Sequence, residues 1–164
     1  MDISIYSLQD LLLAALKSEI DSQKVYSGVA RQVDNFMLRD RFEFLAAEEN
    51  KHQKIFTAIW KERYPSEKIV LPEKSPVPLP EIVFEENKTP ISSVIDQAMK
   101  AEMAAYDFYN ALSDKFREEP PVKHMLAYVA NMEIGHYKLL ETEKEAMANL
   151  EDADVTWPNI HLGP

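Results

Sequence analysis

Two short stretches decide the fold of this 164-residue chain: Glu49-Asn50-Lys51-His52 and Glu133-Ile134-Gly135-His136. Each places a glutamate three residues before a histidine, and positions three apart lie on one face of a helix. Another glutamate stands 30 or 31 residues before each pair, with a tyrosine seven residues after it. These earlier pairs are Glu19 with Tyr26 and Glu102 with Tyr109. The chain is therefore an internal repeat of two similar halves.

The first half predicts two antiparallel helices, over 8–33 and 36–63. The midpoint between Glu19 and Glu49 is Asp34, and Asp34-Asn35 is a pair that favours a turn. The two glutamates then lie at one height, about 22 Å from the turn at a rise of ~1.5 Å per residue. The first hairpin therefore presents one carboxylate from each helix at the same level.

The second half predicts the same arrangement, with helices over 90–116 and 121–148. The midpoint between Glu102 and Glu133 falls just before Pro120-Pro121. Two consecutive prolines end one helix and can begin the next. Both halves thus bring a glutamate and a Glu-x-x-His pair to one level.

The segment 64–89, between the two hairpins, is too rich in proline to be helical. It has the length to cross the bundle from end to end, which is the connection needed if both hairpins direct their polar residues inward. The sequence therefore predicts an all-α four-helix bundle of two antiparallel hairpins joined by a long crossover. We expect a single domain over 1–164, with a nonhelical tail over 150–164.

The glutamates and histidines interrupt the apolar stripe of each helix. A carboxylate in such a stripe is costly unless it is paired or bound to a metal. Four carboxylates and two imidazoles at one height match the ligand set of a dinuclear metal site in a helical bundle. The alternative is a set of amphipathic helices with charged outer faces, which leaves the interrupted stripes unexplained. The candidate ligands are Glu19, Glu49, His52, Glu102, Glu133 and His136.

The repeat also separates two neighbouring glutamates of the second helix. The pair Glu49 and His52 maps onto its counterpart in the second half with an offset of 84 residues. With that offset Glu48 falls opposite Met132, which is no ligand of this type. We therefore assign Glu49 to the metal and expect Glu48 at the surface or beside the ligands.

Composition excludes several classes of function. A net charge of -10 argues against nucleic acid and anionic membrane surfaces as partners. The absence of cysteine excludes disulfides, thiol catalysis and cysteine-ligated iron–sulfur centres. The apolar run 11–16 lacks the basic start and cleavage site of a signal peptide, and nothing approaches the length of a membrane span. We expect a cytoplasmic protein.

On these residues the chain resembles the ferritin-like superfamily and, within it, the rubrerythrin-like di-iron carboxylate proteins. The resemblance covers 8–148 and rests on the six candidate ligands and on the glutamate-to-tyrosine spacing. It implies two iron ions, although manganese also suits carboxylate and imidazole ligands. It further implies that Tyr26 and Tyr109 hydrogen-bond ligand carboxylates across the core. The implied roles are bridging for Glu49 and Glu133, terminal for Glu19 and Glu102, and one nitrogen each from His52 and His136.

Two departures from the rubrerythrin pattern matter. Rubrerythrins usually carry a second glutamate three residues after the first on the third helix, where this chain has Ala105. The redox-linked exchange of that ligand is therefore not implied here. Ser22 occupies the equivalent place in the first helix, and the two small residues either leave space for an oxidant or let helices pack closely. The family's cysteine-ligated rubredoxin centre also has no counterpart, because the chain contains no cysteine.

The resemblance implies a redox function connected with oxidative stress. A di-iron enzyme of this type would reduce hydrogen peroxide, or dioxygen, with electrons from an external rubredoxin-like donor. The alternatives are iron storage with ferroxidase activity in a cage, and a metal-stabilised helical bundle with an interaction role. The doubled Glu-x-x-His pattern favours the first, since storage ferritins usually lack it. We expect a homodimer, in which the crossover would also permit exchange of hairpins.

Overall fold

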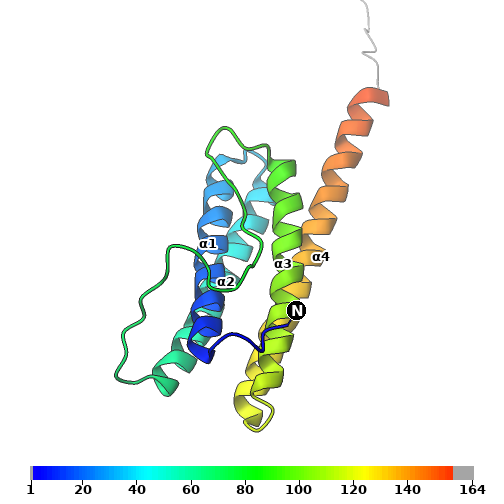
Figure 1. Cartoon of the computed structure of the whole chain (residues 1–164). Helices are drawn as coiled ribbons and strands as arrows, with labels where there is room; N and C mark the ends of the chain where they lie inside the picture. The colour runs from blue at the N-terminus through cyan, green and yellow to red at the C-terminus, as the bar shows by residue number, and fades with distance from the viewer. Residues whose placement is uncertain (1, 157–164) are drawn as a thin grey trace, which may run out of the picture.

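The structure, a computed structural model, describes residues 2–156, and the side chains of 2–148 (Figure 1). Within these residues it contains helices and no strand, so the predicted all-α architecture is confirmed. The helices form two hairpins, α1 with α2 and α3 with α4, joined by a long crossover. Their bounds are α1 Leu8–Gln32, α2 Phe36–Arg63, α3 Ile91–Lys115 and α4 Pro120–Thr156.

Side-chain caps fix the first hairpin. The Ser7 side chain accepts a hydrogen bond from the backbone N–H of Asp10 at 3.1 Å, and the Asp10 carboxylate accepts one from the Ser7 N–H at 3.3 Å. At the turn, the Asn35 side-chain oxygen accepts the backbone N–H groups of Met37 and Leu38 at 2.9 and 3.2 Å. The Asp34-Asn35 pair therefore both turns the chain and begins α2.

The fourth helix is longer than the sequence pattern predicted. It begins at Pro120, where a proline has no N–H to lose in the first turn, and it continues to Thr156. The expectation of a nonhelical tail was therefore wrong for 150–156, and 157–164 lie outside the described residues. The physical reason is that neither glycine nor proline occurs between Gly135 and Pro158, while alanine, glutamate and leucine favour helix.

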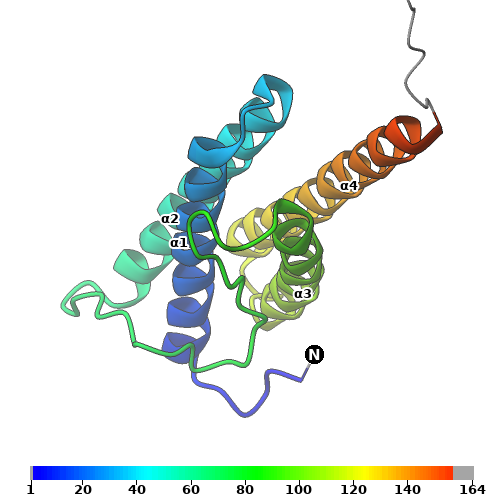
Figure 2. The ribbon, with the colours of Figure 1, turned by 90° about the horizontal axis from the view of Figure 1, so that it is seen from above.

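The crossover covers one side of the bundle, along α1 and α3 (Figures 1 and 2). Its backbone N–H groups at Asn87 and Val83 donate to Gln32 of α1 at 2.6 Å and to Gln97 of α3 at 2.9 Å. The crossover residue Val77 is fully buried. The side formed by α2 and α4 lacks this cover, and α4 runs on past the ends of the other helices (Figure 1).

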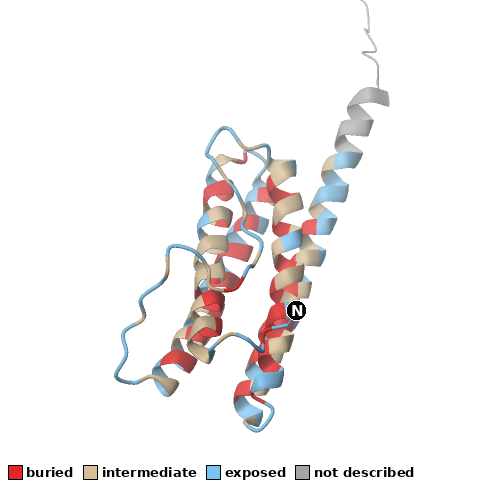
Figure 3. Cartoon of the chain, viewed as in Figure 1, coloured by how far each residue is buried: buried red, intermediate tan, exposed pale blue. Residues whose placement is uncertain are grey.

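Buried residues occur on all four helices (red in Figure 3), and their apolar side chains form two clusters at different heights in the bundle. On α1, for example, one cluster takes residues 11–16 and the other takes 26–33. The other three helices divide in the same way, and the six candidate ligands fall between the two clusters on every helix. The bundle therefore carries a polar layer sandwiched between two apolar ones. No helix in the described part of the chain is long and apolar enough to cross a membrane.

Candidate metal centre

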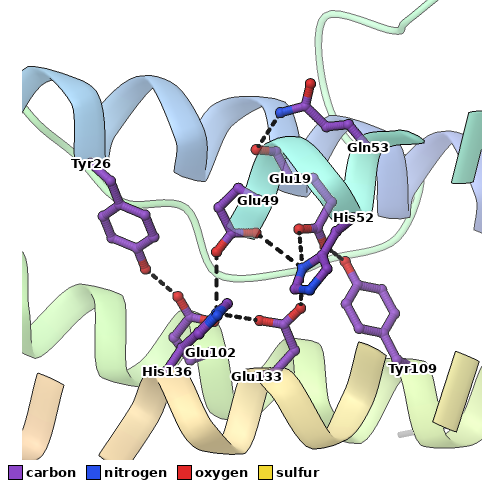
Figure 4. A network of polar contacts seen from close by, with 9 residues as sticks. All are labelled: Glu19, Tyr26, Glu49, His52, Gln53, Glu102, Tyr109, Glu133 and His136. Carbon is purple, nitrogen blue, oxygen red and sulfur yellow. Dashed lines mark hydrogen bonds and ion pairs between the residues drawn. The ribbon is translucent and has the colours of Figure 1, made fainter. Parts of the chain in front are cut away.

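All six residues singled out by the sequence meet inside the bundle (Figure 4). Each is at most 3% exposed. The helices α1 and α3 contribute one glutamate each, and α2 and α4 each contribute a glutamate with the histidine three residues later. Equal spacing from each turn therefore brings the side chains to one level.

The six side chains form two overlapping groups of four. In each group, one potential ligand atom per residue lies within 4.8 Å of the others. Because Glu49 and Glu133 belong to both groups, each has one carboxylate group positioned between two sets of ligands. A carboxylate has two oxygens, so this position suits a bridge between two cations. The groups are Glu19, Glu49, His52 and Glu133, and Glu49, Glu102, Glu133 and His136.

Both imidazoles direct their Nδ1 atoms into this layer. The Nδ1 atom of His52 lies 3.0 Å from Glu133 and 3.1 Å from Glu19. The Nδ1 atom of His136 lies 3.2 Å from Glu133 and 3.4 Å from Glu49. One N–H group cannot donate well to several carboxylates at once. The convergence of oxygens on each nitrogen is the arrangement that a metal cation would satisfy.

Several buried polar atoms of this layer lack a hydrogen-bond partner. They include an oxygen of Glu49 and one of Glu133, and the Nε2 atoms of His52 and His136. Buried polar groups in proteins are nearly always paired, so a cluster of unpaired ones requires a physical explanation. Cation binding accounts for the two carboxylate oxygens. Carboxylate and imidazole donors suit iron and manganese, so the residues present fit a dinuclear centre.

Electrostatics leads to the same conclusion. Burial raises the pKa of Glu19 well above its usual value, and the neighbouring Glu49 raises it further. Burial raises the pKa of Glu133 to about 8, and the charges of Glu19 and Glu102 add to the effect. Burial alone would lower the pKa of His52, but contacts with Glu133 and Glu19 outweigh it and raise the pKa to about 12. The metal-free layer therefore retains protons, which metal cations would displace.

Counting the charges of the ligands shows how two metal ions would change this layer. Four carboxylates carry four negative charges, and two protonated imidazoles would offset only half of them. Two divalent cations would offset all four and leave both imidazoles neutral, which is the form that binds metal. Two divalent cations would thus replace the protons that the metal-free layer retains on its glutamates and histidines.

Two buried tyrosines tie the hairpins together through this layer (Figure 4). The Tyr26 hydroxyl on α1 donates to Glu102 on α3, and the Tyr109 hydroxyl on α3 donates to Glu19 on α1. Burial raises the pKa of both tyrosines well above their usual value, and the nearby carboxylates raise it further. The hydroxyls therefore stay protonated and orient the two glutamates, as the resemblance implied.

Two neighbours of the layer complete its surroundings. Glu48 was expected at the surface or beside the ligands; it is buried, with 7% exposed, and its carboxylate accepts from the ammonium of Lys51. It stands outside both ligand groups, in agreement with its assignment as a non-ligand. The side chain of Gln53 donates to the backbone oxygen of Glu19 at 3.1 Å, a contact that no spacing rule reveals.

The two small residues considered for an oxidant space lie elsewhere. Ala105 is buried in one of the apolar clusters. Ser22 lines a groove between α1 and the crossover. The structure therefore places Ala105 in an apolar cluster and Ser22 in the groove beneath the crossover.

Comparison with known proteins agrees with this geometry. The family model described as rubrerythrin matches residues 10–144. A solved structure of a hypothetical protein from Pyrococcus furiosus is 31% identical, with a TM-score of 0.82 over 91% of this chain and 95% of that chain. No protein of curated function matches. The chain belongs to the rubrerythrin family, which is a ferritin-like di-iron family.

Proposed function

We propose that this member of the rubrerythrin family is a di-iron oxidoreductase that reduces hydrogen peroxide with electrons from a separate donor protein. The observation that carries the proposal is the pair of overlapping ligand groups that share Glu49 and Glu133. Such sharing suits two metal ions held side by side, which together supply two electrons. The reduction of one peroxide molecule consumes two electrons and two protons and yields two molecules of water.

The residues of this chain prepare the layer for that chemistry. Tyr26 and Tyr109 hold Glu102 and Glu19 in place, which fixes the outer carboxylates while leaving oxygens free for a cation. The apolar clusters above and below exclude water from the layer. In a dry surrounding, fixed charges act more strongly on a reacting molecule than they would in water.

The composition of the chain supports an external source of electrons. The chain has no cysteine, so it has no iron–sulfur or rubredoxin centre of its own. We propose an external donor of rubredoxin type, which would dock by a basic patch or by a small apolar contact because this protein carries a net charge of -10. We also propose that the protein works as a homodimer in the cytoplasm. Light scattering that shows a large cage would instead favour iron storage.

Two measurements test the proposed function. Metal analysis after anaerobic loading with ferrous ion should find two ions per chain, and one ion or none in a folded protein would remove the dinuclear centre. Stopped-flow oxidation of the loaded protein should be faster with hydrogen peroxide than with dioxygen. If peroxide is no faster, the function is that of an oxidase or oxygenase. If neither oxidises the metal, the metal has a structural role.

A further inference from the structure

We propose that a small neutral oxidant reaches the metal centre through a pocket between α2 and α4, which stays open because position 135 carries no long side chain. This inference rests on the proposed function, because it describes how the substrate of that function would enter. The pocket has a volume of about 360 Å³ and lies on the side that the crossover leaves bare. Its walls are Arg41, Phe44, Asn131, Met132, Gly135, His136 and Leu139.

The pocket meets the polar layer at His136. This residue lines the pocket and also directs its Nδ1 atom at the carboxylates of the layer. The ring of Phe44 stands edge-on to the imidazole, with 6.4 Å between ring centroids and an interplanar angle of 88°. Phe44, Met132 and Leu139 make the wall mainly apolar. Such a wall favours a small uncharged molecule over an ion.

Gly135 has no conformational or packing reason to be glycine. Its φ is not positive, and a Cβ added there would meet nothing within 4 Å. By contrast, a Cβ at Gly28 would lie 2.5 Å from the Phe84 ring, so a side chain there would require Phe84 to shift. Glycine inside a helix weakens it relative to alanine. The absence of a long side chain at position 135 leaves open space beside His136.

The other half of the molecule fills the equivalent place. With the offset of 84 residues that relates the two histidines, Gly135 corresponds to Lys51 and Met132 corresponds to Glu48. Lys51 and Glu48 form an ion pair, and Glu48 is buried. A charged pair therefore lies beside His52, whereas the apolar pocket lies beside His136. This difference gives the centre one open side.

The test uses Gly135→Lys, which copies the side chain of the closed half, with Gly135→Ala as the matched control. The first readout needs no metal: peroxide should oxidise Met132 to the sulfoxide more slowly in Gly135→Lys, as measured by peptide mass spectrometry. The exposed Met125 serves as an internal reference whose oxidation should not change. The second readout is the rate at which nitric oxide, a neutral diatomic probe, reacts with the ferrous-loaded protein in stopped flow.

We expect both rates to fall severalfold in Gly135→Lys and to stay near the parent value in Gly135→Ala. Circular dichroism and metal content should be unchanged, because the added carbon enters open space. If Gly135→Lys loads two ions and reacts at the parent rate, the route is wrong. Equal slowing by Ala and Lys would also overturn it, since a methyl group cannot fill the pocket. A protein that loads no metal would refute the proposed function, while the Met132 measurement would still test the pocket.

Discussion

The hairpins α1–α2 and α3–α4 are alike at the centre of the bundle and unlike on its bare side. Both place a glutamate, a tyrosine and a Glu-x-x-His pair in the buried layer. At the positions directly before these ligands, the first hairpin carries the ion pair of Glu48 and Lys51, where the second carries Met132 and Gly135. The common residues build a symmetrical centre, and the differing ones decide from which side it is reached.

The largest expected effect is on metal content and comes from substituting the glutamate that each hairpin contributes to both ligand groups. Glu49→Ala and Glu133→Ala each remove a carboxylate shared by both ligand groups. We expect each variant to bind at most one ion instead of two, as measured by metal analysis after ferrous loading. Glu48→Ala is the neighbouring control and should retain two ions. Loss of metal from Glu48→Ala alone would show that the repeat aligns the wrong glutamate.

The next effect tests whether the hairpins depend on one another equally. Tyr26→Phe and Tyr109→Phe each remove a hydroxyl that holds a glutamate of the other hairpin. Loss of such a supporting hydrogen bond weakens metal binding by roughly 10- to 100-fold. Competition with a chelator should find similar losses for the two variants. A large loss in only one of them would show that the centre is functionally asymmetric.

The third effect is the pH dependence of thermal stability, which should differ between the metal-free and the metal-loaded protein. The folded pKa of Glu133, about 8, and that of His52, about 12, both lie above their ordinary values of 4.5 and 6.5. The protonated forms of these groups make their largest contribution to the free energy of unfolding when the pH is below their ordinary pKa. That contribution is lost as the pH rises toward the pKa in the folded state. The metal-free protein should therefore lose on the order of 10 °C in Tm between pH 5.5 and 8.

The loaded protein should show the opposite trend over the same range, because protons compete with metal for the ligands. Thermal unfolding followed by circular dichroism, with and without a bound divalent ion, measures both trends. Parallel curves for the two forms would mean that the ions do not bind to these groups.

The smallest expected effect lies at the exposed contact between the hairpins. Arg41 of α2 pairs with Glu143 of α4 at 3.2 Å, and the Arg41 side chain is 49% exposed. Exposed ion pairs contribute about 0–1 kcal/mol. Arg41→Ala should therefore change the free energy of unfolding by less than about 1 kcal/mol in urea titration. A larger loss would mean that this pair, and not the buried layer, holds the hairpins together.

The sequence predicted those parts of the structure that depend on the spacing of residues along a helix. Residues three apart share a helix face, and equal distances from two turns set Glu19 and Glu49 at one height. The length of α4 was underestimated, although no glycine or proline interrupts that region before Pro158.

Other features depend on how separate helices pack, which one sequence does not reveal. The burial of Glu48 depends on what packs against its face of α2. The hydrogen bond of Gln53 reaches a backbone atom on α1. One residue of the sequence did indicate the pocket beside His136. Gly135 is a glycine inside a long helical pattern, and such a residue calls for a structural reason.

The polar layer also marks the register of the bundle. If one helix slid by a turn along its neighbour, a carboxylate would enter an apolar cluster and an apolar residue would enter the layer. Buried polar residues are known to fix helix alignment in this way, at some cost in stability. The same residues that prepare the centre for metal would thus disfavour misaligned bundles while the chain folds, before any ion has been bound.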